Sequence, residues 1–124
     1  MMIRTHVSLD SAHKLNLPYV SKCNNLHGHR WEIDVEVDGE KGGDGMVVDF
    51  STIKNYFEKF DHVFLNNLFE KDFETTAENL IDFWLNDLGK YLSEIGCKVY
   101  FLTLTVAETP KNIAKQTMAF ASNL

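Results

Sequence analysis

The sequence predicts an α+β fold in which helices cover one face of an antiparallel sheet. The segment 31–37 alternates apolar and acidic residues, which is typical of a half-buried strand. Segments 52–60 and 77–92 instead repeat apolar residues at intervals of three and four, as helices with one buried face do. The predicted order is strand, strand, helix, helix, strand, followed by a segment from Asn112 that fits either a strand or a short helix. Strands grouped apart from helices in this way indicate the α+β class.

The first half of the chain supplies two of the strands and one helix. Residues 2–10 place apolar or β-branched side chains at alternate positions, which predicts a strand. The glycine-rich segment 39–45 predicts a turn or loop after the strand at 31–37. Ser51 is a suitable N-cap for the helix at 52–60, because its hydroxyl can accept a hydrogen bond from an amide of the first turn.

The second half supplies a longer helix and a further strand. Thr75 to Glu78 has the spacing of a capping box, which predicts that a helix begins there. The apolar pattern of this helix ends at Gly96. Residues 99–106 are dense in β-branched and aromatic side chains, and we expect a strand that is buried on both faces and leads to Glu108.

Composition and charge limit the classes of protein to consider. With 124 residues, 44% of them hydrophobic, the chain is expected to form one domain over 1–124 with a core that needs no metal or disulfide. The 12 basic residues are scattered and outnumbered by 18 acidic ones, which argues against nucleic acid as a partner. No apolar run approaches the roughly 20 residues of a membrane span, and no signal core opens the chain. We therefore expect a cytoplasmic protein without a membrane partner, with Cys23 and Cys97 as free thiols.

The segment from Cys23 to His29 carries the strongest indication of chemistry. His27 and His29 are two residues apart, so in an extended backbone both rings point to the same side. Imidazole and thiolate are preferred zinc ligands, and His13 is the nearest further candidate upstream. Our interpretation is a zinc ion bound by His13, His27 and His29, with Cys23 beside it as a reactive group. A closed structural site with Cys23 as fourth ligand is the alternative, although a self-sufficient core favours the open, catalytic form.

Three other polar positions have both a structural and a functional interpretation. Cys23 is either a small buried residue or, near zinc and Lys22, a thiolate. The pair Asp61–His62 follows a helix and is either a solvated helix end or an acid/base pair. Glu108 ends a buried strand, where a carboxylate is costly unless it is solvated or accepts two parallel N–H donors from an amidine-like ligand.

Six short motifs occur together in a fixed order along the chain. They are Ser11-Ala12-His13-Lys14-Leu15, Cys23-x-x-x-His27-Gly28-His29, Gly45-Met46-Val47-Val48-Asp49-Phe50, Asp61-His62 with Leu65-Asn66, Thr76-x-Glu78-Asn79-Leu80, and Glu108-Thr109. In this combination the chain resembles the 6-pyruvoyl-tetrahydropterin synthase family. The gap of three residues between Cys23 and His27 is most similar to the 6-carboxytetrahydropterin synthases of queuosine (7-deazaguanine) biosynthesis, since animal pyruvoyl enzymes have a longer gap there.

The resemblance implies a tunnelling fold (T-fold), with a four-stranded antiparallel sheet and two helices on one face. Three such subunits would close a barrel and two barrels would stack into a hexamer, with pterin bound at subunit interfaces. The residues that match the family's functional positions are His13, His27 and His29 as zinc ligands, Cys23, Asp61 and His62 as catalytic groups, Glu108 as pterin anchor, and Thr76 and Glu78 as pocket residues.

The implied reaction converts 7,8-dihydroneopterin triphosphate into 6-carboxy-5,6,7,8-tetrahydropterin, with loss of acetaldehyde and triphosphate. A 6-pyruvoyl-tetrahydropterin synthase and a non-catalytic zinc-stabilised protein are the alternatives. The chain departs from the family pattern at Thr75, where relatives have proline, and in its tail, which lacks a Tyr-(Lys/Arg)-Gly triplet. The sequence therefore does not single out which cations bind the triphosphate, and four lysines are candidates: Lys14, Lys22, Lys111 and Lys115.

Overall fold

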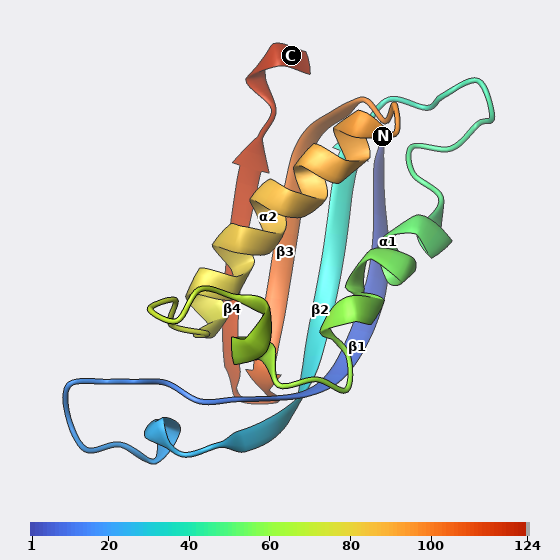
Figure 1. The fold of residues 1–124 in the computed structure, drawn as a ribbon. Coiled ribbons are helices and arrows are strands. Elements are labelled where there is room, and N and C mark those ends of the chain that lie inside the picture. Colours follow the sequence, from blue (N-terminus) through green and yellow to red (C-terminus); the bar gives the residue numbers. More distant parts are fainter. Residues whose placement is uncertain (124) are drawn as a thin grey trace.

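The structure, a computed structural model, describes residues 1–123 and consists of one sheet with helices packed against it (Figure 1). The four strands are antiparallel and lie in the order β1-β2-β3-β4: β1 (Met2–His13), β2 (His27–Gly39), β3 (Val99–Thr109) and β4 (Asn112–Ala119). The helices are α1 (Phe50–Phe57) and α2 (Ala77–Glu94), with short 3-10 turns at Lys22–Asn24, Glu58–Phe60, Leu65–Leu68 and Ala121–Asn123. The predicted α+β class is confirmed, and the ambiguous segment from Asn112 is a strand.

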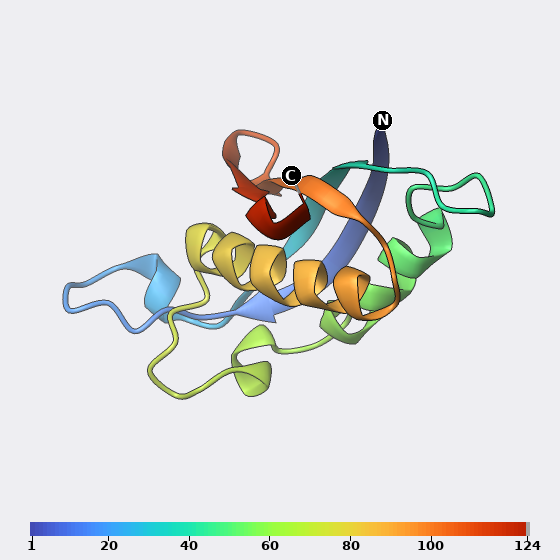
Figure 2. The same cartoon turned by 90° about the horizontal axis from the view of Figure 1, so that it is seen from above.

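Both helices cover the same face of the sheet, and the core lies between them and the strands (Figure 2). The apolar residues predicted to alternate in β2, such as Trp31 and Ile33, are fully buried on this face. Trp84 of α2 packs edge-on against Phe57, with ring centroids 5.4 Å apart, and so links the two helices. In residues 1–123 no helix is both long enough and apolar enough to cross a membrane.

The helix starts differ from the predictions by one or two residues. Asp49, not Ser51, caps α1: its carboxylate accepts hydrogen bonds from Ser51 N at 2.9 Å and Ser51 Oγ at 2.7 Å. A carboxylate also interacts favourably with the positive end of the helix dipole, which explains the earlier start. Thr76 caps α2 by accepting from Asn79 N, whereas Thr75 is buried and its hydroxyl donates to Lys14 O and Asn66 Oδ1.

The prediction that residues 99–106 are buried on both faces is wrong for this chain. Leu102, Leu104 and Val106 are fully buried beneath the helices, but Phe101 on the other face is 37% exposed. The helices cover one face only, so the opposite face of β3 is open along the described chain.

The pairing of the strands gathers the predicted site at one end of the sheet. His13 at the end of β1 lies opposite His27 at the start of β2, and Ser11 lies opposite His29. Because β3 runs antiparallel to β2, its end also reaches this region, where Ala107 pairs with Glu32. Strand β1 is longer than predicted, running to His13 rather than to residue 10, and this extension carries a site residue.

Candidate metal centre

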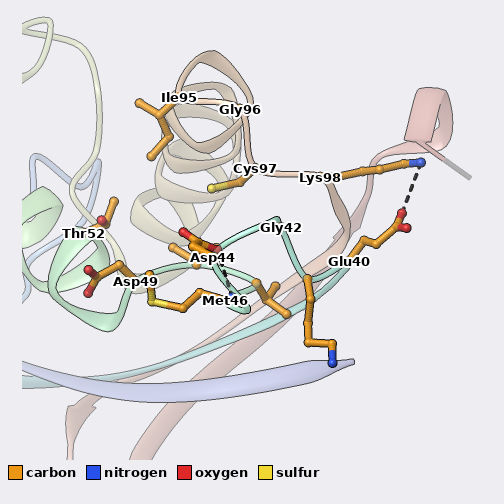
Figure 3. A pocket seen from close by; sticks show the side chains of 13 residues that line it. Glu40, Gly42, Asp44, Met46, Asp49, Thr52, Ile95, Gly96, Cys97 and Lys98 are labelled. Carbon is orange, nitrogen blue, oxygen red and sulfur yellow. Dashed lines mark hydrogen bonds and ion pairs between the residues drawn. The ribbon is translucent and has the colours of Figure 1, made fainter.

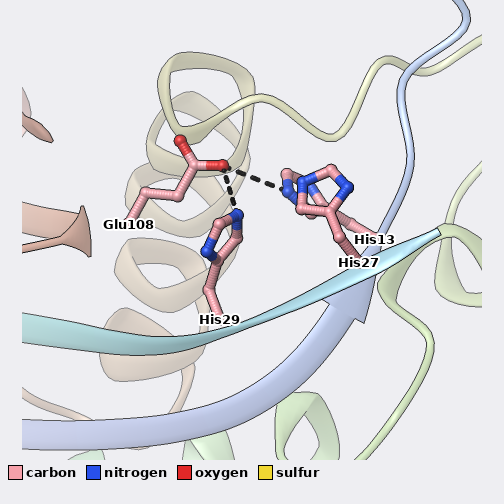
Figure 4. A group of neighbouring side chains, drawn as sticks. All are labelled: His13, His27, His29 and Glu108. Atoms are coloured by element: carbon pink, nitrogen blue, oxygen red, sulfur yellow. Dashed lines mark ion pairs between the residues drawn. The ribbon is translucent and has the colours of Figure 1, made fainter. Parts of the chain in front are cut away.

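Three histidines and one glutamate converge at this end of the sheet (Figure 4). One ligand atom from each of His13, His27, His29 and Glu108 lies within 4.8 Å of the others. Glu108 Oε1 is 3.1 Å from His13 Nε2 and 3.0 Å from His29 Nε2. The predicted His13–His27–His29 group is therefore assembled, with Glu108 as a fourth member.

Backbone carbonyls fix the orientation of two of the rings. His13 Nδ1 donates to the carbonyl of Thr75 at 2.7 Å, and His27 Nδ1 donates to the carbonyl of Asn25 at 2.6 Å. With Nδ1 carrying the proton, each Nε2 presents a lone pair, which is the arrangement usual for metal-binding histidine. Trp31 packs edge-on against His13 at a centroid distance of 4.9 Å and limits rotation of that ring.

The donor set has the chemistry of a cation site. Nε2 of His13 and of His29 are buried and make no hydrogen bond with any described residue, although Glu108 is close to both. Burial, the largest influence, lowers the pKa of His29 and favours its neutral form, while contact with His13 lowers the pKa of Glu108. Neutral imidazoles and a carboxylate that direct lone pairs at one point repel each other unless a cation lies there, so the four residues fit zinc.

Glu108 occupies the fourth position of the metal group, which the sequence had predicted to be vacant. The sequence predicted a vacant fourth position with Glu108 elsewhere as a ligand anchor, and the structure instead directs Glu108 at the histidines. Cys23 lies in the turn Lys22–Asn24, is partly buried and is outside the metal-binding groups found in residues 1–123. The loop that carries this turn extends away from the end of the sheet (Figure 1). The structure thus gives no support to Cys23 as the fourth ligand.

Asp61 and His62 form a second polar group, on the outer edge of β1. Asp61 Oδ1 accepts from the amide of Asp10 at 2.8 Å, and this hydrogen bond is the largest cause of the lowered pKa of Asp61. His62 Nδ1 lies 3.0 Å from Asp61 Oδ2, so the two predicted partners are in contact. His62 has a φ of 55° and a side chain that is 76% exposed. It lines an open cavity of about 560 Å³ that His29 also lines.

The chain is similar to known proteins in sequence and in structure. Residues 2–118 match the 6-pyruvoyl tetrahydropterin synthase family. The chain belongs to this family. It is 32% identical to a Haemophilus influenzae protein named 6-carboxy-5,6,7,8-tetrahydropterin synthase, over 69% of this chain and 80% of the relative.

Two further comparisons bear on the extent of the similarity. A putative 6-carboxy-5,6,7,8-tetrahydropterin synthase from Pyrococcus horikoshii is 42% identical over 43% of this chain, which spans only 34% of that relative. The structure of Caenorhabditis elegans 6-pyruvoyl tetrahydropterin synthase superposes with a TM-score of 0.73 at 28% identity, covering 96% of both chains. The likeness to the solved structure therefore extends over nearly the whole chain and supports the T-fold.

One of the two predicted pocket residues lines a cavity with Glu108. Glu78, in the first turn of α2, lines a cavity of about 410 Å³ together with Glu108 and Lys111. Of the four lysines considered for the triphosphate, Lys111 is the one that lines this cavity. Thr76 caps the same helix at its start, so the capping interaction accounts for its side chain.

A cavity of about 540 Å³ at the opposite end of the sheet lies apart from this chemistry (Figure 3). It is lined by the segment after β2 and the segment after α2, with an ion pair of 3.3 Å between Lys98 and Glu40 at its rim. Burial raises the pKa of the Cys97 thiol here. None of the site histidines lines this cavity, and we assign it no part in the reaction.

Proposed function

We propose that the chain is a zinc-dependent carbon–carbon lyase of the 6-carboxytetrahydropterin synthase type. It converts 7,8-dihydroneopterin triphosphate into 6-carboxy-5,6,7,8-tetrahydropterin, releasing acetaldehyde and triphosphate, in the cytoplasmic biosynthesis of queuosine and other 7-deazaguanines. The observation that carries the proposal is the convergence of His13, His27 and His29, with the Nε2 atoms of His13 and His29 buried and without a hydrogen bond to any described residue. The names of the relatives support the choice of product.

Binding of the pterin is assigned to a carboxylate. Glu108 offers two oxygens in one plane, which match the two parallel N–H donors on the amidine-like edge of a pterin ring. Glu78 and Thr76 are the proposed neighbours of the ring, because Glu78 lines the cavity next to Glu108 and Thr76 precedes it by two residues.

Proton transfer is assigned to two groups that stand apart from the metal ligands. Zinc held by the histidines would supply Lewis acidity toward the oxygens of the substrate side chain, which makes the adjacent C–H more acidic. Cys23 moves protons on one face of the pterin, and His62 does so on the other. Asp61, 3.0 Å from His62 Nδ1, holds that ring in one orientation. The oxidation change is internal to the substrate, so no redox cofactor is needed.

The active protein is proposed to be a homo-oligomer, namely a hexamer built as a dimer of trimers. Cys23 lies outside the metal group of its own chain, so a site formed at an interface between copies brings the required groups together more readily than one chain does. The outer edge of β4 is unpaired along the described residues and is available for a second copy.

The decisive experiment is incubation of the zinc-loaded protein with 7,8-dihydroneopterin triphosphate, with products identified by mass. Acetaldehyde with 6-carboxytetrahydropterin is the expected result, and 6-pyruvoyl-tetrahydropterin would reassign the chain to the other activity of the family. Cys23→Ala should abolish turnover while zinc stays bound. Loss of zinc and of the fold in that variant would instead favour a non-catalytic, zinc-stabilised protein.

A further inference from the structure

The Glu108 carboxylate cannot contact the histidines and bind the pterin at the same time. Its carboxylate oxygen is directed at the buried Nε2 atoms of His13 and His29, 3.1 Å and 3.0 Å away (Figure 4). The proposed function, however, requires the same carboxylate to accept two N–H donors from the pterin. A carboxylate that binds a planar amidine edge must present both oxygens to it, and so must turn from the histidines.

The surroundings of Glu108 leave room for such a turn. Its side chain is 26% exposed, whereas that of His13 is 2% exposed. Glu108 lines a cavity of about 410 Å³ next to Glu78, and also one of about 400 Å³ next to Arg30. Backbone carbonyls hold the rings of His13 and His27. Within residues 1–123 the Glu108 carboxylate contacts histidines alone, and Glu108 lies where the pairing of β3 with β4 is irregular, between Ala107 and Thr109. Glu108 is therefore the mobile member of the group.

We propose that Glu108 is a substrate-displaced gate on the metal centre. In the resting protein its carboxylate completes the zinc donor set with His13, His27 and His29. The pterin edge then draws the carboxylate away, and the position that it leaves becomes available to oxygens of the substrate side chain. This inference rests on the proposed function for the identity of the ligand, and it explains how a group with four protein donors can admit a substrate.

The gate predicts that zinc and pterin weaken each other's binding. Zinc and pterin both bind the Glu108 carboxylate, so either ligand binds less tightly when the other is already bound. The loss of binding free energy is the same in both directions. A pterin without a substituent at C6 is the informative probe, because it offers the amidine edge but has no side-chain oxygens to reach the metal. If Glu108 were only a pterin anchor, zinc would leave the affinity for this probe unchanged.

The experiment measures the affinity of the whole protein for unsubstituted pterin by calorimetry, with and without saturating zinc. We expect binding about 10-fold weaker with zinc, and an equal loss of zinc affinity in chelator competition when pterin is saturating. Glu108→Gln should weaken zinc binding about 10-fold without any pterin present, since an amide is a poorer ligand than a carboxylate. Glu78→Gln, which alters the other carboxylate of the same cavity, should keep both the zinc affinity and the coupling.

Equal pterin affinity with and without zinc would overturn the gate, as would unchanged zinc affinity in Glu108→Gln. Neither measurement depends on turnover. A protein that shows the coupling but releases no acetaldehyde from 7,8-dihydroneopterin triphosphate would refute the proposed reaction and leave the gate standing. A protein that releases acetaldehyde from this substrate but shows no coupling would refute the gate and leave the proposed reaction standing. Failure of unsubstituted pterin to bind at all would count against both Glu108 roles.

Discussion

At the scale of single residues, the orientation of His13 depends on two polar residues outside the metal group. The side chain of Asn66 accepts from Lys14 N at 3.0 Å and donates to Lys14 O at 2.8 Å, which secures the residue that follows His13. Thr75 is fully buried, with its hydroxyl 3.2 Å from Asn66 Oδ1 and its carbonyl bonded to His13 Nδ1. Thr75 and Asn66 therefore hold the end of β1 and the ring of His13 as one unit.

Loss of the Thr75 hydroxyl should weaken metal binding without removing a ligand. We expect Thr75→Val, which keeps the shape of the side chain, to lower zinc affinity about 10-fold, as changes behind metal ligands commonly do. Thr75→Ser keeps the hydroxyl and should restore most of that affinity. Asn67→Ala, at an exposed neighbouring position, is the control and should bind zinc like the wild type. Equal affinities in Thr75→Val and Thr75→Ser would show that the hydroxyl has no such role.

His6, on the open face of the sheet, makes the stability of the fold depend on pH. It contacts Glu32 and lies 2.9 Å from Asp34, and the hydrogen bond to Asp34 is the main cause of a raised His6 pKa. Its contribution to stability is complete below the unfolded pKa of about 6.5 and is lost as the pH rises through the folded value. Denaturant midpoints should therefore fall above neutral pH in the wild type and change less in His6→Gln. Parallel pH profiles for the two proteins would contradict this.

At the scale of elements, the sequence predicts what depends on local pattern and misses what depends on neighbours. The alternation in β2 is a property of its own side chains, and it predicted the buried face correctly. The exposed face of β3 could not be inferred, because a run of β-branched residues does not reveal whether anything covers its second side. The cap of α1 was misplaced because Asp49 and Ser51 are both good caps, and only the path of the loop decides between them.

Gly39, at the end of β2, lies where β2 closely approaches the start of β3. A Cβ at this position would lie 2.5 Å from the backbone carbonyl of Lys98, which cannot move without shifting the start of β3. We expect Gly39→Ala to lower the free energy of unfolding by about 1–3 kcal/mol, the usual effect of overpacking. Gly43→Ala, where a Cβ meets nothing within 4 Å, should change it by less than about 0.5 kcal/mol. Urea denaturation of the two variants makes the comparison, and equal losses would point to backbone flexibility instead.

At the scale of the whole molecule, the register of the sheet completes the site. The spacing of His27 and His29 predicted two ligands on one side, and His13 was predicted as the third because it is the nearest further candidate upstream. No local pattern could show that Glu108, 79 positions after His29, lies 3.0 Å from it, because that depends on the pairing of β2 with β3. Cys23 was expected beside the metal because it is close to His27 in sequence. It lies in the turn Lys22–Asn24, outside the metal group of the described residues, and its catalytic role stays a prediction.

The edges of the sheet determine how copies can assemble. Residues 61–64 cover the last part of β1, where Asp10 N donates to Asp61 and Ala12 N donates to Val63 O. Since amides alternate along a strand and the pairing of β1 with β2 has no bulge, the N–H of Arg4 also points away from β2. Within residues 1–123, the first half of β1 thus presents unpaired amides to solvent, as a site of strand addition does.

Arg4→Pro should therefore dissociate the proposed hexamer while the subunit stays folded. Proline removes one outward N–H and is tolerated on an edge strand, because no hydrogen bond to β2 is lost. Arg4→Ala is the control: it removes the 3.4 Å ion pair with Asp34 but keeps the amide, and an exposed pair of this kind contributes little. Sedimentation velocity should show the wild type and Arg4→Ala as the same assembly and Arg4→Pro as smaller species with an unchanged circular dichroism spectrum. An intact assembly in Arg4→Pro would place the subunit contact on another edge or on the open face of the sheet.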